Sequence, residues 1–335
     1  MRRSRISGLG IHVPDRVVTN DELGTFMDTS DEWIIQRTGI RERRWADPET
    51  ATSDLGVAAA RAALSDAGVE ASDVDMIVFA TLSPDHYFPG AACFLQAKMG
   101  MGGIPAIDVR QQCTGFVYAL SLADAYVRIG MASRVLVVGA EIHSAGLDVT
   151  TRGRDVAVLF GDGAGAAVVE ATDVADPATD PHIWSSHLHA DGTGAEELWL
   201  PAPGMAYERF MTKDQIDAGL QYPVMNGRTV FVNAVKRMSE AVVEAAAAND
   251  IEVADVDLFL FHQANLRINQ SVAGHLGIDD TKVFNTIERY GNTTAATIPI
   301  GMFEARAAGA LEPGMVVMLA AFGSGFTWGA TLLRF

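Results

Sequence analysis

Residues 108–130 read DVRQQCTGFVYALSLADAYVRIG, a short β-type segment that passes through a polar elbow into an almost uncharged helix. Phe116, Leu120 and Val127 recur at helical spacing, and a helix this apolar is expected to lie buried. Cys113 stands at its N-terminus, where unpaired backbone N–H groups and the helix dipole favour a thiolate. Cys113 is therefore either an activated nucleophile or, as is common for a lone cysteine, a buried structural residue.

The composition describes an acidic globular protein. The chain has 335 residues, 49% of them hydrophobic, and a formal charge of −17 at pH 7. Nucleic-acid binding needs a basic face, so this charge argues against such a partner. Cys93 and Cys113 suggest no disulfide framework, no apolar run reaches the ~18 residues of a membrane span, and no cleavable leader pattern follows the basic start. We expect a soluble cytoplasmic protein that binds neither nucleic acid nor membrane.

The second half of the chain repeats the first. Residues 69–79 read VEASDVDMIVF and residues 251–261 read IEVADVDLFLF, and each segment follows an alanine-rich helix. Duplicated β/α units pack as layered α/β structures. Because no linker rich in Pro, Gly or Ser separates the halves, we expect residues 1–172 and 173–335 to form two similar units around one continuous core.

The repeat also aligns polar residues. Cys113 in the first elbow corresponds to Asn292 in the second, and the strand that ends at Phe261 delivers His262. If the halves pack about a pseudo-twofold axis, Cys113, His262 and Asn292 meet in one place. A lone histidine at a strand end is usually structural, but one that meets a cysteine and an asparagine predicts a catalytic centre.

Two other motifs suggest sites that we do not favour. Residues 156–170, VAVLFGDGAGAAVVE, contain a glycine-rich turn, but the dinucleotide fingerprint requires a helix after the turn, and a β-type segment follows here. We prefer a strand–turn–strand hairpin. His182, His187, His189 and Asp191 could bind a metal, yet alternate histidines also suit the exposed face of a strand, and no further ligand cluster accompanies them.

A basic cluster occurs near the N-terminus, where residues 37–44 contain four arginines. Trp33 precedes Arg37 by four residues, which places an aromatic ring and a guanidinium on the same side of a helix. Such a pair could bind an adenine ring or a phosphate. The alternative is a solvated charged face beside a packed tryptophan.

Six motifs are spread along nearly the whole chain: DTSDEWI at 28–34, RTGIRER at 37–43, FGDGAGAAV at 160–168, HQANLRI at 262–268, GNT at 291–293 and FTWG at 326–329. Together they resemble the β-ketoacyl-acyl carrier protein synthase III family of condensing enzymes. The resemblance implies a thiolase-like α/β fold, with duplicated β/α halves in α-β-α-β-α layers around a pseudo-twofold axis.

By this resemblance Cys113, His262 and Asn292 form the catalytic set, the same three residues that the repeat aligns. The backbone N–H groups of Cys113 and Ser324 would hold an oxyanion. The resemblance also implies a set of binding residues: Trp33 and Arg152 around the coenzyme A adenine, with Arg37 and Asn265 as further contacts; Phe88 across a homodimer interface, closing the partner's acyl pocket; and Arg267, Lys236 and Arg237 against the carrier protein.

The implied reaction needs no permanently bound cofactor and no metal. Cys113 would take an acyl group from acyl-CoA, and malonyl-acyl carrier protein would then lose carbon dioxide and condense with it, which begins fatty acid synthesis. Nε2 of neutral His262 and the Asn292 amide would donate hydrogen bonds to the enolate. One alternative is a thiolase-fold relative in secondary metabolism with another acceptor. A paralogue that only binds acyl-CoA or carrier protein is another, against which the intact Cys, His and Asn argue.

The chain also departs from the family pattern. Arg110, Gln111 and Gln112 replace small residues before the nucleophile, Val232 stands where a lysine often occurs, and Ser324 stands where a glycine may supply an oxyanion N–H. Residues 200–225 are longer than in the typical short-chain enzyme. They contain Met205, Tyr207, Phe210, Met211, Tyr222 and Met225. An apolar insertion of this length predicts acyl primers longer than acetyl, unless it only covers dimer surface.

Overall fold

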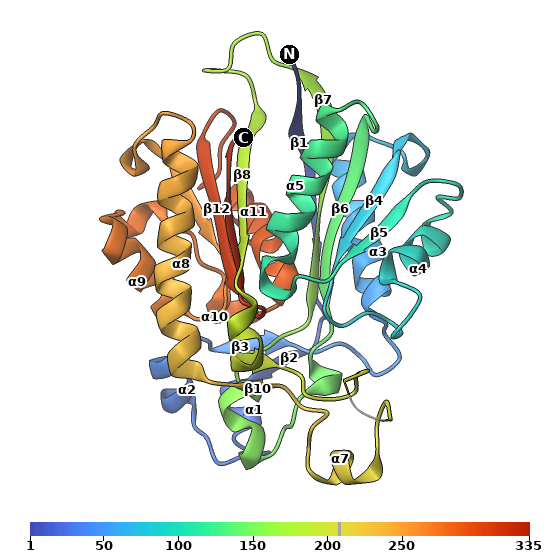
Figure 1. The fold of residues 1–335 in the computed structure, drawn as a ribbon, viewed down its shortest axis with the longest axis vertical. Coiled ribbons are helices and arrows are strands. Elements are labelled where there is room, and N and C mark those ends of the chain that lie inside the picture. Colours follow the sequence, from blue (N-terminus) through green and yellow to red (C-terminus); the bar gives the residue numbers. More distant parts are fainter. Residues whose placement is uncertain (207–208) are drawn as a thin grey trace.

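Two β-sheets form the frame of the molecule (Figure 1). The computed structural model describes residues 1–206 and 209–335. In spatial order, the first sheet contains β1 (Arg2–His12), β7 (Gly163–Asp173), β6 (Arg134–Glu141), β4 (Met76–Ala80) and β5 (Ala106–Val109). The second contains β11 (Leu258–Phe261), β12 (Val316–Gly323), β13 (Thr327–Arg334) and β8 (His182–Ala190).

Helices cover both sheets and fill the space between them. The outer face of the first sheet carries α3 (Thr52–Ala67) and α4 (Ala91–Met99), and that of the second carries α8 (Gly227–Ala247) and α9 (Leu266–Leu276). Between the sheets lie α5 (Gly115–Arg128) and α11 (Thr297–Ala307) (Figure 1). The predicted α-β-α-β-α layering is confirmed. The almost uncharged sequence of α5 is explained by its central position, because both of its sides face protein.

Shorter elements connect this frame. Two small sheets pair β2 (Val17–Thr19) with β3 (Glu42–Arg44) and β9 (Leu198–Trp199) with β10 (Val224–Met225). The short helices are α1 (Asn20–Leu23), α2 (Asp31–Thr38), α6 (Arg154–Ala157), α7 (Lys213–Asp217) and α10 (Ile287–Tyr290). Among the described helices, none combines the length and apolarity that crossing a membrane requires.

Strand register repeats between the halves. The parallel pair β4–β6 and the antiparallel pair β6–β7 of the first half correspond to β11–β12 and β12–β13 of the second. Asp75 accepts a hydrogen bond from the N–H of Arg134 at 2.9 Å, and Asp257 accepts one from the N–H of Val316 at 2.8 Å. In both halves one aspartate therefore ties the start of the buried strand to its parallel neighbour.

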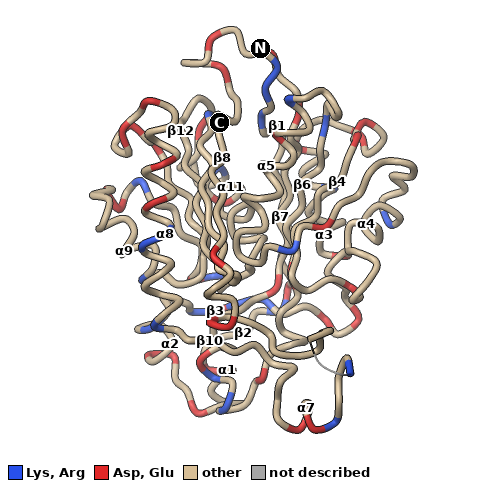
Figure 2. Tube along the Cα trace, in the orientation of Figure 1, with Lys and Arg blue, Asp and Glu red and all other residues tan. Residues whose placement is uncertain are grey.

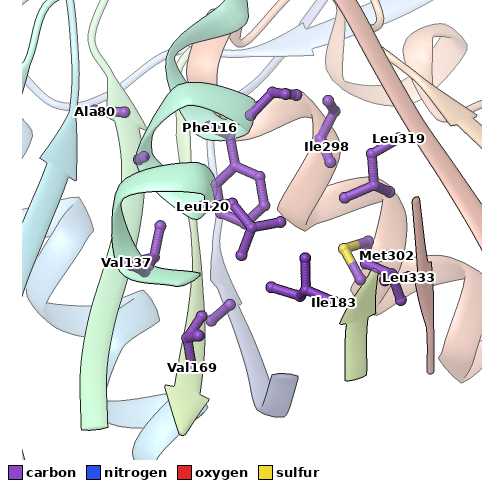
Figure 3. Close-up of a cluster of buried hydrophobic side chains, with 14 of the residues drawn as sticks. Ala80, Phe116, Leu120, Val137, Val169, Ile183, Ile298, Met302, Leu319 and Leu333 are labelled. Carbon is purple, nitrogen blue, oxygen red and sulfur yellow. The ribbon is translucent and has the colours of Figure 1, made fainter. Parts of the chain in front are cut away.

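One cluster of buried apolar side chains joins the two halves (Figure 3). Phe116 and Leu120 of α5 pack with Val137 of the first sheet and with Leu319 and Leu333 of the second. Burying each such side chain stabilises the fold by about 1.5–3 kcal/mol. This packing agrees with the predicted continuous core. The division into units 1–172 and 173–335 stays a prediction.

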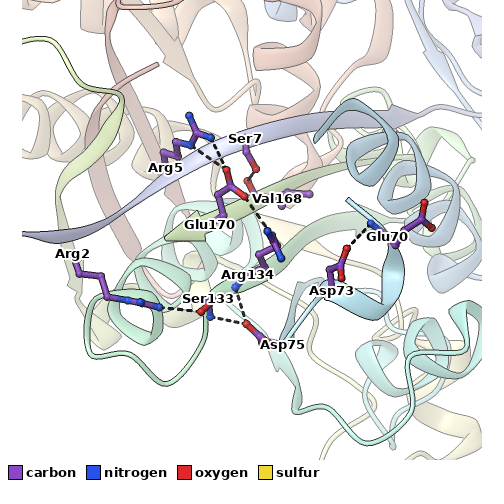
Figure 4. Close-up of polar contacts among 10 residues, drawn as sticks. All are labelled: Arg2, Arg5, Ser7, Glu70, Asp73, Asp75, Ser133, Arg134, Val168 and Glu170. Atoms are coloured by element: carbon purple, nitrogen blue, oxygen red, sulfur yellow. Dashed lines mark hydrogen bonds and ion pairs between the residues drawn. The ribbon is translucent and has the colours of Figure 1, made fainter. Parts of the chain in front are cut away.

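Ion pairs connect neighbouring strands of the first sheet (Figure 4). Glu170 on β7 contacts Arg5 on β1 at 2.7 Å and Arg134 on β6 at 3.4 Å. Pairs of this kind at a surface contribute at most about 1 kcal/mol each. Their main effect is to fix the order of three adjacent strands.

The predicted hairpin over residues 156–170 is wrong in its first arm. That arm starts within α6, and β7 pairs with β6 and β1 instead. The cause lies in the second half of the chain, because the carbonyl of Leu159 accepts a hydrogen bond from the N–H of Asn292 at 2.8 Å. This contact holds the segment beside the second elbow and overrides its β-propensity. A strand does follow the glycine turn, as predicted, and the second half has a true hairpin between β12 and β13.

Candidate active site

Cys113 lies in a single turn of 3-10 helix, Gln112–Thr114, immediately before α5. Only 6% of its surface is exposed. Gln112 adopts φ of 44°, a left-handed conformation that is uncommon outside glycine and is often found at functional sites. The backbone N–H groups of Cys113 and Ser324 and the side chain of Asn292 lie near the Cys113 thiol.

The β12–β13 hairpin approaches the nucleophile closely. A Cβ atom on Gly323 would lie 2.6 Å from Cβ of Cys113, so only glycine fits there. The Ser324 hydroxyl donates a hydrogen bond to the carbonyl of Leu198, and its side chain is thereby engaged away from the thiol. The Thr114 and Thr327 hydroxyls are 2.8 Å apart and tie the hairpin to the elbow. Serine at position 324 is thus compatible with a backbone N–H directed at Cys113.

His262 and Asn292 are joined by a network of threonines. His262 is 2% exposed, and its Nδ1 lies 2.7 Å from Oγ1 of Thr297. The Thr297 hydroxyl donates to the carbonyl of Thr294 at 2.9 Å. The N–H of Thr294 donates to Oδ1 of Asn292 at 2.8 Å, which leaves the Asn292 amide group free to point its N–H atoms elsewhere. Among the described residues, Nε2 of His262 has no hydrogen-bond partner.

Burial controls the protonation of the site. Burial, followed by the nearby charge of Glu141, raises the pKa of the Cys113 thiol to about 12. Burial lowers the pKa of His262 to about 3 and raises that of Glu141 to about 7. The expectation that the helix N-terminus makes Cys113 a thiolate is therefore wrong, because burial disfavours the charged form more than the neighbouring N–H groups favour it. A neutral thiol needs a proton acceptor, and neutral histidine is suited to that task.

A cavity of about 440 Å³ opens onto the elbow. Cys113 and Asn292 line it together with Trp33, Arg37 and Asn265. Much of the remaining wall is apolar: Val158, Leu159, Leu198, Met225, Val230, Phe231 and Ile268. The cavity thus combines a thiol with a long apolar surface and an aromatic and basic cluster.

That basic cluster differs in detail from the expectation. The guanidinium of Arg37 lies 4.3 Å from the ring centre of Trp33, as the spacing predicted, and that of Arg154 lies 4.7 Å away. Arg152 instead binds Asp148 at 2.6 Å and lies over Tyr222 at 5.5 Å. Arg154 therefore occupies the position expected for Arg152, whose role in coenzyme A binding stays a prediction.

Asn265 is a structural link as well as a wall of the cavity. Its side chain caps α9 by accepting a hydrogen bond from the N–H of Arg267 at 2.9 Å and donates to the carbonyl of Arg37 at 3.0 Å. It therefore fixes α9 against α2, and its predicted contact with coenzyme A is untested.

The other predicted binding residues lie farther out. Phe88 is 80% exposed, next to Tyr87. Lys236 is exposed, Arg237 pairs with Glu240 at 3.0 Å, and the guanidinium of Arg267 lies 6.0 Å from the ring centre of Phe231. Their roles at the dimer interface and in carrier-protein docking stay predictions.

The insertion at residues 200–225 lies beside the cavity. Leu198 on β9, just before the insertion, and Met225 on β10, its last residue, line the cavity wall. Within it, Phe210 packs edge-on against Tyr87 at 5.0 Å, whereas Met205 is 74% exposed. Tyr207 lies outside the described residues.

The histidines of β8 have partners other than a metal. His187 and His189 contact Glu244 at 3.3 Å and 2.6 Å, and His189 stacks on Trp328. In residues 1–206 and 209–335, no three His, Cys, Asp or Glu side chains are grouped as metal ligands would be.

Four buried residues of the site were not anticipated from the sequence: Glu141, His143, Thr294 and Thr297. Nε2 of His143 lies 2.5 Å from Oγ1 of Thr294, and Thr294 itself adopts φ of 50°. The only signal in the sequence was three threonines, Thr293, Thr294 and Thr297, shortly after Asn292 in an otherwise apolar run.

Two packed β/α halves that bring a cysteine and a second polar elbow to the start of a central helix are the arrangement of thiolase-fold condensing enzymes, which are acyltransferases. Two family profiles match this chain: "3-Oxoacyl-[acyl-carrier-protein (ACP)] synthase III" over residues 107–192 and its C-terminal counterpart over residues 246–335. The chain belongs to the β-ketoacyl-acyl carrier protein synthase III family.

Full-length relatives support this assignment. The chain is 46% identical over 332 residues to β-ketoacyl-[acyl-carrier-protein] synthase III of Xanthomonas campestris, covering 99% of this chain and 98% of the relative. The crystal structure of the Aquifex aeolicus 3-oxoacyl-[acyl-carrier-protein] synthase III superimposes with a TM-score of 0.89 at 39% identity, covering 99% and 100% of the two chains. A priming β-ketosynthase of a polyketide biosynthetic pathway superimposes with a TM-score of 0.88 at 34% identity, covering 99% and 96%.

Proposed function

We propose that this enzyme transfers an acyl group from acyl-CoA to Cys113 and condenses it with malonyl-acyl carrier protein, with loss of carbon dioxide. The product is a β-ketoacyl-acyl carrier protein, and the reaction begins fatty acid synthesis in the cytoplasm. One observation carries the proposal: a buried thiol lies against two backbone N–H groups and an amide side chain, beside a cavity with an aromatic and basic cluster.

Acyl transfer begins with attack of the Cys113 sulfur on the thioester carbon of acyl-CoA. The N–H groups of Cys113 and Ser324 are suited to bind the oxyanion of the tetrahedral intermediate. Coenzyme A leaves and an acyl-enzyme remains, so we expect ping-pong kinetics. The close approach of Gly323 keeps the hairpin N–H beside the sulfur and supports this role.

Condensation uses the second half of the fold. Loss of carbon dioxide from the malonyl group leaves an enolate, and its carbon attacks the acyl-cysteine. Asn292 is suited to donate to the enolate oxygen, because the N–H of Thr294 fixes its Oδ1 and so orients the amide. No redox cofactor or metal takes part in this proposed chemistry.

Substrate binding follows the charge and shape of the cavity. Trp33 and the nearby guanidinium groups of Arg37 and Arg154 are suited to bind the adenine ring and the phosphates of coenzyme A. The carrier protein is expected to be acidic, so docking on a chain of charge −17 requires a local basic surface. Figure 2 shows Lys and Arg positions along α8 among acidic residues, and we assign Lys236, Arg237 and Arg267 to this surface.

We further propose a homodimer in which Phe88 closes the acyl pocket of the partner subunit. Phe88 and Tyr87 are 80% and 52% exposed, and Phe210 of the insertion joins them. Large exposed aromatic groups of this kind mark interfaces more often than free surface.

A single experiment tests the function and the primer. The enzyme is mixed with malonyl-acyl carrier protein and acyl-CoAs of two to twelve carbons, and acyl-enzyme and products are measured by mass. We expect β-ketoacyl-acyl carrier protein, with chains longer than acetyl preferred, because each buried methylene contributes about 0.8 kcal/mol. Shortening the insertion should remove that preference, and a strong preference of the intact enzyme for acetyl-CoA would contradict it.

A second candidate function shares the first half-reaction. The structural likeness to a priming β-ketosynthase of a polyketide pathway favours an enzyme that passes its acyl group to another acceptor. In the same experiment such an enzyme forms the acyl-cysteine but no β-ketoacyl-acyl carrier protein.

A further inference from the structure

The Thr297 hydroxyl lies between two groups of the site. Its oxygen is 2.7 Å from Nδ1 of His262 and 2.9 Å from the carbonyl oxygen of Thr294. A carbonyl only accepts hydrogen bonds, and a hydroxyl has one proton. When that proton is donated to Thr294, the hydroxyl oxygen can only accept at Nδ1, which must then carry a hydrogen.

The opposite arrangement satisfies fewer groups. If Thr297 donated to Nδ1 instead, its bond to the Thr294 carbonyl would be lost, and the proton of His262 would move to Nε2. No partner for Nε2 exists among the residues that the structure describes. Nε2 is therefore unpaired in either tautomer, and the two arrangements differ by the hydrogen bond from the Thr297 hydroxyl to the Thr294 carbonyl, which favours the two-bond arrangement.

We propose that Thr297 is a positioning residue that keeps the proton of neutral His262 on Nδ1 and thereby makes Nε2 the proton acceptor of the active site. The tautomer of His262 does not depend on the proposed function. Only the use of Nε2 as proton acceptor in the reaction rests on that function. It also corrects the expectation that Nε2 of neutral His262 donates to the enolate, because in this tautomer Nε2 is a donor only after it has taken up a proton.

The proton balance of both half-reactions then follows. In acyl transfer, Nε2 accepts the Cys113 proton as the sulfur–acyl bond forms, and returns it to the coenzyme A sulfur as that carbon–sulfur bond breaks. In condensation, decarboxylation leaves an electron pair that forms the new carbon–carbon bond, and the acyl–Cys113 bond breaks with its electrons on sulfur. This second half-reaction consumes one proton, which Nε2 takes from water, presents to the enolate oxygen and delivers to Cys113.

The Thr294 carbonyl, which accepts the hydrogen bond of the Thr297 hydroxyl, is held in place by the second elbow. The hydroxyl of Thr294 is engaged by His143 at 2.5 Å, its N–H by Asn292 at 2.8 Å and its carbonyl by Thr297. Thr294 therefore fixes the carbonyl that orients the Thr297 hydroxyl and the side chain of Asn292 at once. A change at Thr297 should be felt at His262 without a contact to substrate.

Nitrogen NMR of the ¹⁵N-histidine-labelled enzyme tests the tautomer directly, with His262→Gln used to assign the signal. In the free wild-type enzyme we expect a hydrogen on Nδ1 and none on Nε2. Thr297→Val removes the acceptor of Nδ1 and should move the hydrogen to Nε2, whereas Thr297→Ser keeps the hydroxyl and the wild-type pattern. A hydrogen on Nε2 in the free wild type overturns the proposal.

Kinetics supply the second measurement. Thr297→Val should lower kcat of condensation by about tenfold to a hundredfold, the usual range for a mispositioned general base, with KM for acyl-CoA nearly unchanged. Thr297→Ser should restore the rate. Thr331→Val is the matched control, because Thr331 is as buried and loses one 2.8 Å bond to Ser186, but lies on β13 away from His262.

The outcomes separate the two proposals. If the wild type condenses and Thr297→Val condenses as fast as the wild type, or no slower than Thr297→Ser, while thermal unfolding shows all variants folded, the positioning role is wrong. If Thr297→Val is unfolded, the wild-type NMR pattern and the rate of Thr297→Ser still decide. If the wild type yields no β-ketoacyl product, the proposed function fails, whereas the tautomer result stands by itself.

Discussion

The two elbows of this fold occupy equivalent places but contribute opposite kinds of chemistry. The first presents Cys113, a thiol whose pKa burial raises to about 12. The second presents Asn292 within a network of threonines and histidines that is largely satisfied. Duplication therefore supplies two similar elbows, and a few polar residues give one of them a thiol and the other an amide in a hydrogen-bonded network.

The strand ends beside the nucleophile differ in the same way. In the first half β6 ends at Glu141, a buried carboxyl group that accepts from Ser83, Thr81 and the N–H of Leu82. In the second half β12 ends at Gly323, followed by the N–H of Ser324. One strand thus places a potential negative charge near the sulfur, and the other places a donor there.

The largest effect should come from removing the nucleophile. Cys113→Ala should abolish acyl transfer while the protein remains folded, because the change leaves only a small void. Intact-protein mass after incubation with each acyl-CoA should show no adduct. An adduct that persists would place the nucleophile elsewhere, for example at the exposed Cys93, for which Cys93→Ala is the control.

Changes in the second elbow should separate the two half-reactions. His262→Ala and Asn292→Ala should slow condensation by about 10²–10³, the typical effect of losing one group that stabilises an oxyanion. Acyl-enzyme should still form, although more slowly for His262→Ala if Nε2 accepts the thiol proton. Rapid-quench mass measurements of each step provide the test, and equal damage to both steps by Asn292→Ala would contradict its assignment to condensation.

Much of the correspondence between the two halves could be predicted from the sequence. The repeat aligns segments whose pattern of apolar residues depends only on neighbouring positions in the chain. The match of residues 69–79 to 251–261 places β4 and β11, and continuing the repeat with an offset three residues shorter aligns Cys113 with Asn292. The layered fold followed from the duplication of β/α units, and the apolar sequence of α5 predicted that this helix is largely buried.

Contacts between distant segments could not be predicted in this way. The Thr297–His262 bond joins residues 35 positions apart, and Leu159 loses its expected strand partner to Asn292. Spacing also cannot tell which of Arg152 and Arg154 faces Trp33, because that depends on a short turn at Thr151–Gly153. Desolvation of the thiol is likewise a property of the packed core and not of the helix terminus alone.

A smaller effect should follow from disturbing the hairpin. Gly323→Ala would place Cβ 2.6 Å from Cβ of Cys113, so hairpin and elbow must separate. We expect a loss of about 1–3 kcal/mol in the free energy of unfolding, as for overpacked cores, and about a tenfold slower acylation as the Ser324 N–H moves from the sulfur. Gly274→Ala on α9 is the control, because a Cβ there meets nothing within 4 Å. Acylation at the wild-type rate would remove the hairpin from the oxyanion site.

The smallest effect should come from Glu141→Gln, which removes the charge that opposes a thiolate at Cys113. Above pH 7 the wild-type carboxyl is ionised and helps to raise the pKa of the thiol, so the variant should react with iodoacetamide a few-fold faster at pH 8, with Cys93 replaced in both proteins.

The pH dependence of the free energy of unfolding gives an independent test of Glu141. Burial raises the pKa of Glu141 from 4.5 to about 7, so wild-type stability that is present below pH 4.5 is lost as pH rises through 7. The variant has no such group, and the buried His143 and His262, whose contribution runs in the opposite direction, are common to both proteins. The difference in unfolding free energy, variant minus wild type, should therefore increase between pH 5 and pH 7.5 by an amount on the order of 2 kcal/mol. A difference that stays flat with pH would mean that Glu141 is already ionised at pH 5, and the contrast between the two strand ends would then be one of permanent charge.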